Sequence, residues 1–112
     1  MSANLKFKPS GSVDVVSYSL YHKPYVPGEV LTKDNATDSV DLGKPAAQSD
    51  GFIHIELNTI PELQTLDGDY DLGVAAIDDA SNVSPLLTQG LANISLDFLA
   101  PSPPSEASVY WN

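Results

Sequence analysis

Five aspartates gather in one stretch, LDGDYDLGVAAIDDASNVSP (66–85), and carboxylates at such spacing could bind a metal ion or transfer protons: Asp67, Asp69, Asp71, Asp78 and Asp79. The first three have the D-x-D-x-D spacing with which an EF-hand calcium loop begins. The match then fails, because Leu72 stands where the loop needs glycine and Asp78 stands where it needs glutamate. On a strand, Asp69 and Asp71 would point away from Tyr70 and toward solvent. We therefore expect a strand with solvent-facing carboxylates here.

The loop after this strand carries a second set of oxygen ligands. Asp78, Asp79 and Asn82 follow one another closely, and a loop of this kind could hold Ca²⁺ at a junction between modules. The same side chains also commonly cap their own turn. We expect the turn-capping role, with no metal and no other cofactor, and keep these three residues as the weak candidates for Ca²⁺.

Residues for nucleophilic or acid/base catalysis are sparse. The chain has no cysteine, which excludes disulfides, thiolate zinc sites and cysteine nucleophiles. His22 and His54 are the only histidines, and no sequence context brings either one to a carboxylate pair. No G-x-S-x-G, H-E-x-x-H, P-loop or dinucleotide motif occurs. We expect a protein that is not an enzyme and has no catalytic residues.

Size and charge limit the classes of partner. A length of 112 residues fits one domain, and 42% hydrophobic residues suffice for one core. With 15 acidic and 5 basic residues, the net charge is −10, which argues against nucleic acid as a partner. No apolar run approaches the roughly 20 residues of a membrane-spanning helix, so we expect no membrane insertion.

The elements that must position these side chains are short strands. Apolar residues alternate with period 2 and stop at glycine, proline or aspartate turns, which is typical of an all-β sandwich or barrel. The expected strands cover residues 5–9, 15–22, 52–57, 70–77 and 92–99, with a doubtful edge strand near 40–42. We expect one β-sandwich over residues 1–100, followed by a proline-rich linker and strand-like tail over residues 101–112.

The alternation also selects the residues of the core. The inward-facing positions of the expected strands are Phe7, Val16, Tyr18, Leu20, Ile53, Ile55, Leu57, Tyr70, Leu72, Val74, Ile94, Leu96 and Phe98. In the tail, "ASVYW" has the alternation of a strand, and aromatic residues favour interfaces. Val109, Tyr110 and Trp111 are therefore the candidates for an interface.

Several stretches resemble the fibronectin type III family and related immunoglobulin-like modules. "VSYSLYH" is similar to the third strand of that family, with Tyr18 as its core tyrosine, and "YDLGVAAIDDASNVSP" is similar to the sixth strand and its loop. The resemblance implies an antiparallel two-sheet sandwich in which Tyr70 forms a tyrosine corner, its hydroxyl bonded to backbone near 63–66. Phe7 stands where the second strand of the family has tryptophan. The first strand of the family is missing or replaced.

The resemblance also implies a kind of function. We expect a non-catalytic interaction or spacer module of a larger extracellular or cell-surface protein, with another protein or adjacent domains of the same chain as partners. The alternative is a Ca²⁺- or carbohydrate-binding accessory domain of a secreted hydrolase. Because "LKFKP" would form an open sheet edge, we also consider a homodimer in which tails are exchanged as strands.

Overall fold

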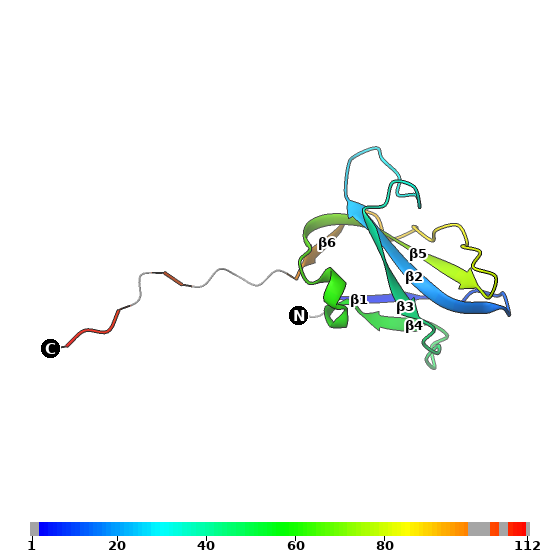
Figure 1. Cartoon of the computed structure of the whole chain (residues 1–112), viewed down its shortest axis with the longest axis horizontal. Helices are drawn as coiled ribbons and strands as arrows, with labels where there is room; N and C mark the ends of the chain where they lie inside the picture. Colours follow the sequence, from blue (N-terminus) through cyan, green and yellow to red (C-terminus); the bar gives the residue numbers. More distant parts are fainter. Residues whose placement is uncertain (1–2, 99–103, 106–107, 112) are drawn as a thin grey trace.

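The computed structural model describes residues 3–98, 104–105 and 108–111, and within them the chain forms two antiparallel sheets (Figure 1). The strands are β1 (Asn4–Phe7), β2 (Val15–Pro24), β3 (Asp38–Gly43), β4 (Ile53–Glu56), β5 (Asp67–Asp78) and β6 (Ile94–Asp97). Two 3₁₀ turns, η1 (Leu57–Thr59) and η2 (Pro61–Leu63), connect β4 to β5. The described part of the chain has no helix that is long and apolar enough to cross a membrane.

Strand pairing confirms the predicted all-β class. β1 pairs with β4 in one sheet, and the other sheet has the order β3-β2-β5-β6. The five strands expected over 5–9, 15–22, 52–57, 70–77 and 92–99 are all present within a few residues of those bounds. The doubtful strand near 40–42 is also real: β3 pairs with β2 alone, as an edge strand does.

The two sheets enclose a single apolar core, to which β1 and β4 contribute from one side and the four-stranded sheet from the other. The Phe7 and Tyr18 rings meet edge to face across the two sheets, with centroids 5.1 Å apart. Eight predicted core residues are buried: Phe7, Tyr18, Leu20, Ile53, Leu57, Leu72, Val74 and Leu96. Four more are partly buried against them: Ile55, Tyr70, Ile94 and Phe98.

The prediction was wrong for Val16. A bulge in β2, between Val15 and Ser17 in the register with β5, adds one residue at the start of the strand. Because side chains alternate along a strand, this extra residue turns Val15 into the core and leaves Val16 51% exposed. The sequence pattern continues through the bulge and does not reveal it.

The prediction was also wrong for Asp71, which is buried rather than solvent-facing, with 4% of its surface exposed. Side chains from segments 25–37 and 79–93 cover the outer face of the four-stranded sheet, opposite to β1 and β4. Segment 79–93 also runs beside β5, to which it is paired by reciprocal backbone hydrogen bonds between Val74 and Leu87. Leu31 and Leu86 come from these segments and lie over Gly73, where an added Cβ would be 3.2 Å from each. Lys33 joins the segments by donating to the carbonyls of Val83 and Ser84.

β1 begins and β6 ends at the same end of the molecule (Figure 1). The Leu57 N–H donates to the Ala3 carbonyl at the start of β1, and the Phe98 N–H donates to the Leu66 carbonyl just after β6. Residues 57–66 contain η1 and η2, so these turns form the common end of both strands. Further along, 108–111 form no strand within the single chain, although "ASVYW" has strand character. The proline-rich stretch at 101–103 lies outside the described residues.

Candidate functional site

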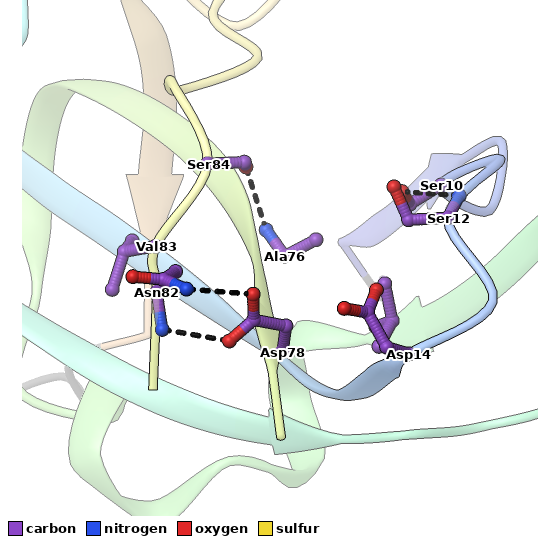
Figure 2. A pocket seen from close by; sticks show the side chains of 9 residues that line it. Ser10, Ser12, Asp14, Ala76, Asp78, Asn82, Val83 and Ser84 are labelled. Carbon is purple, nitrogen blue, oxygen red and sulfur yellow. Dashed lines mark hydrogen bonds between the residues drawn. The ribbon is translucent and has the colours of Figure 1, made fainter. Parts of the chain in front are cut away.

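A shallow groove lies at the end of the sandwich opposite to η1 and η2, and we call it the loop-end groove. One wall is the β1–β2 turn, the other is the loop that follows β5, and Figure 2 shows polar side chains from both walls. Its volume is about 170 Å³. It is lined by Ser10, Ser12, Asp14, Val15, Ala76, Asp78, Asn82, Val83 and Ser84.

The Asp78 carboxylate holds the β5 wall of this groove together. It accepts hydrogen bonds from the Asn82 N–H at 2.8 Å and the Asn82 side-chain amide at 3.0 Å (Figure 2). It also accepts one from the Ala80 N–H at 2.9 Å. The hydrogen bonds from Asn82, side chain first and then backbone, hold the pKa of Asp78 below its usual 3.8. Ser81 completes the turn with a left-handed φ of 66°. These contacts match the turn-capping role predicted for Asp78 and Asn82.

The three weak Ca²⁺ candidates do not converge on one point. Asp78 directs both carboxylate oxygens to its own turn, and Asp79 is exposed, its N–H donating to the Asp14 carbonyl across the groove at 3.1 Å. Among the described residues, no three histidine, cysteine, aspartate or glutamate side chains are grouped closely enough to hold a metal ion. The first three aspartates of the stretch lie along β5, with Asp67 and Asp69 exposed and Asp71 buried.

A second depression runs along the open side of the sandwich, and we call it the edge slot. It has a volume of about 150 Å³ and shares Ser10, Ala76 and Ser84 with the loop-end groove. Apolar groups from β1, β2, β5 and the 84–87 segment dominate its lining: Phe7, Tyr18, Val74, Ala75, Ala76, Pro85 and Leu87, with Lys8, Ser10 and Ser84 at its polar margin. Both depressions are smaller than the roughly 300–1,000 Å³ of typical small-molecule sites. They can receive a side chain or an extended backbone.

An ion cluster that sequence reasoning missed lies on the outer face of the sheet. Lys23 is only 3% exposed, and its ammonium group lies 3.0 Å from Glu29 and 3.7 Å from Asp71. Lys23 also donates to the Pro24 carbonyl at 3.0 Å, while Asp71 accepts from the Asn93 N–H at 2.9 Å. The cluster thus ties both covering segments to β2 and β5. Lys23 and Asp71 are cross-strand neighbours, which only the pairing register reveals.

The two histidines lie in different sheets and line neither depression. His22 is buried in β2 with its ring edge-on to Tyr70, and burial lowers its pKa from 6.5 despite the nearby Asp38 carboxylate. His54 bonds through Nε2 to an Asp50 carboxylate oxygen at 2.8 Å. The Phe52 N–H and then His54 hold the pKa of Asp50 below 3.8. This exposed pair was not anticipated, although its i, i+4 spacing across the turn before β4 is visible in the sequence.

The three aromatic residues predicted to be structural have different environments. Phe7 and Tyr18 pack against each other, and the Tyr18 hydroxyl accepts from the Ser10 N–H at 3.0 Å, which fixes the β1–β2 turn. Tyr70 is half-buried at the edge of the core. Its hydroxyl has no hydrogen-bond partner among the described residues, so the predicted tyrosine-corner bond to residues 63–66 is wrong.

The interface candidates are the most exposed large apolar side chains near the end of the chain. Val109 is 85% exposed, Tyr110 79% and Trp111 91%. Nothing in the described part of the single chain covers them. Comparison with known proteins found no similarity: no family model, curated protein or solved structure matches this chain.

Proposed function

We propose that the chain is a non-catalytic interaction or spacer module of fibronectin type III type, belonging to a larger extracellular or cell-surface protein. The observation that carries the proposal is the strand order. β1 pairs with β4, as the second strand of an immunoglobulin-like sandwich pairs with the fifth. β2 pairs with β5 and β5 pairs with β6, as the third strand pairs with the sixth and the sixth with the seventh. The pairing of β3 with β2 is the variant of this order that suits the fibronectin type.

The path of the chain supports a spacer role. β1 begins and β6 ends at the end of the sandwich that η1 and η2 form, so domains joined before β1 and after β6 would both attach at that end. The packed core between the two sheets would then set the separation of the two attachment points.

The side chains that could react are used to support the fold, which favours an interaction role over catalysis. Asp78 caps its turn, and the Ser84 hydroxyl accepts from the Ala76 N–H (Figure 2). The same hydroxyl donates to the Pro85 carbonyl. Lys23 and Asp71 are joined in the outer-face ion cluster. Both depressions are of a size for protein side chains, so a protein surface is the partner that they fit best.

The spacer role can be tested by placing the chain between two reporter domains and measuring their separation by small-angle X-ray scattering. A single narrow distance distribution is expected. The control replaces the chain with a glycine/serine linker of equal length, whose distribution is broad. If both fusions give the same broad distribution, the spacer role is wrong.

The rival function, an accessory domain that binds Ca²⁺ or carbohydrate, predicts a different result. Its ligand would raise the melting temperature of the chain in a saturable way. We expect no shift in a titration with millimolar CaCl₂ or with soluble polysaccharides. A shift with CaCl₂ that is abolished by Asp79→Asn, but not by the distant control Asp41→Asn, would replace the proposal with the accessory-domain function.

A further inference from the structure

The edge of β1 that faces away from β4 has no partner among the described residues. The Leu57 N–H donates to the Ala3 carbonyl, so Ala3 and Leu57 form a hydrogen-bonded pair of the antiparallel ladder. Because hydrogen-bonded pairs recur at every second residue, Leu5 and Phe7 also direct their backbone N–H and C=O groups to β4. Asn4 and Lys6 direct theirs to the open edge. Their N–H and C=O groups can bind a further strand by backbone pairing.

The edge slot lies beside this open edge and offers an apolar position to such a strand. Phe7 belongs to both features, because its backbone lies in β1 and its ring lines the slot with Tyr18 and Val74. Leu87 lines the far side and is 45% exposed. A strand that pairs with β1 would therefore direct every second side chain over the slot and the core behind it.

The C-terminal segment Ser108–Trp111 has the composition of a strand that could pair with this open edge. Valine, tyrosine and tryptophan are strongly represented in strands and in interface cores. In an extended conformation, Val109 and Trp111 lie on one face and Tyr110 on the other. The segment could thus place two apolar side chains inward and one outward.

The direction of the chain decides which β1 this segment can reach. β6 runs opposite to β1 and ends at the end of the molecule where β1 begins (Figure 1). A tail that turns back along its own sandwich would run parallel to its own β1, and parallel pairs normally need a crossover of a dozen or more residues. A tail that continues in the direction of β6 runs antiparallel to β1 of a second copy placed in line beyond that end. The nine residues 99–107, when extended, span about 30 Å, enough to reach that copy.

We propose that Ser108–Trp111 of one copy pairs antiparallel with β1 of the next copy along the open edge of that strand. Val109 lies opposite Phe7 over the edge slot, and Trp111 lies opposite Leu5. Tyr110 lies opposite Lys6 on the outer face, where the Lys6 ammonium already lies 4.8 Å from the Phe52 ring centroid. Each copy gives one strand and receives one, so the contact is heterologous and builds open head-to-tail chains. This inference is independent of the proposed function, since the open edge is present whatever the role of the module.

The first test is the mass of the full chain in solution, measured by light scattering as a function of concentration. Head-to-tail pairing predicts a mean mass that rises continuously above the 11.9 kDa of one chain and does not level off at two. Val109→Asp places a charge over the apolar slot and should return the mass to one chain at every concentration. The matched control Val26→Asp, at an exposed valine of the 25–37 segment, should not.

Three results in this test would overturn the proposal. A wild-type chain that stays at 11.9 kDa up to millimolar concentration does not pair in trans. A mass that levels off at two chains indicates reciprocal exchange in a closed dimer. Association that persists in Val109→Asp places the contact elsewhere on the molecule.

The second test fixes the register by disulfide trapping, which is clean because the chain has no cysteine. Lys6 and Tyr110 would form a hydrogen-bonded pair with Cα atoms about 5.5 Å apart, within the range that a disulfide spans. The full-length double variant Lys6→Cys/Tyr110→Cys should therefore oxidise to a ladder of covalent multimers. The control Lys6→Cys/Val26→Cys should give no ladder. A covalent dimer alone, an internally bridged monomer or no cross-link would each refute head-to-tail pairing.

Discussion

The two faces of the four-stranded sheet are both covered, but by different means. On the inner face, Leu20, Leu72 and Val74 pack into an apolar core that β1 and β4 close from the opposite side. On the outer face, two irregular segments cover β2 and β5, and the Lys23 ion cluster holds them in place. The inner face is therefore stabilised by close packing, and the outer face depends on specific polar contacts.

The two faces should therefore differ in how they respond to amino-acid substitution. Packing of an apolar core is non-directional, so its cost is set by the volume that a substitution removes. A buried ion pair is directional, and loss of one partner leaves the other charge without compensation. The inner face also contains one exception, His22, whose Nδ1 is buried without a hydrogen-bond partner among the described residues.

The largest effect is expected from Leu20→Ala on the inner face. Leu20 is fully buried, and its truncation should lower the free energy of unfolding by about 2 to 5 kcal/mol. The matched outer-face change, Leu31→Ala, should cost less because its loop can settle into the space that is vacated. Urea denaturation followed by circular dichroism measures both. Equal losses would show that the outer face is packed as rigidly as the core.

Asp71→Leu tests the ion cluster of the outer face. We expect a loss of about 1 to 3 kcal/mol, because the Asn93 N–H loses its acceptor and Lys23 loses one of its two carboxylates. Lys23 still keeps Glu29 and the Pro24 carbonyl, which limits the loss. The double variant Lys23→Met/Asp71→Leu should recover the part of that loss that comes from the uncompensated Lys23 charge, since an apolar pair can replace a buried ion pair. The Asn93 N–H stays without its acceptor in both variants. A double-mutant cycle in chemical denaturation measures the coupling. Additive losses would mean that the ion pair does not hold the outer face.

His22 should make stability depend on pH. Its pKa is lowered by burial in the folded chain, so the unfolded chain binds the proton more readily. The stability that neutral His22 contributes to the folded chain is fully present above its ordinary pKa of 6.5. It is lost as the pH falls through 6.5 toward the lowered pKa of the folded state. The His22→Leu variant should lose this part of the pH dependence, measured as melting temperature between neutral and mildly acidic pH. Asp50 and Asp78 act in a separate window, below 3.8. If the melting temperature of His22→Leu changes with pH as steeply as that of the wild type, the pH dependence comes from other groups.

The smallest effect is expected at the bulge of β2. Val16→Ala should change the free energy of unfolding by less than about 0.5 kcal/mol, as exposed substitutions usually do. Val15→Ala, one residue earlier, should cost about 1.5 kcal/mol because it removes two buried carbon groups. Thermal denaturation of the two variants side by side gives the contrast. The reverse order would place the bulge at another position.

Much of the inner face could be predicted from sequence because alternation is local. Phe7, Leu20 and Leu72 each stand in a run whose period places them inward, and no distant residue is needed to infer this. The outer face could not be predicted in the same way. Asp71 alternates with Tyr70 as a solvent-facing residue does, yet segments far away in the sequence cover it. The edge slot likewise requires Phe7 and Leu87 to be brought side by side.

The sequence by itself determined the strands, the turn that Asp78 caps and the strand character of Ser108–Trp111, because each depends on neighbours within a few residues. Tertiary structure alone decided that Lys23 meets Asp71, that the β2 bulge exposes Val16, and that Phe7 and Leu87 line one slot. These features depend on the register between strands, which is set by the summed packing and hydrogen bonding of many residues. Away from the bulge, a local pattern indicates which way a side chain points. Only the assembled sheets fix what it meets there.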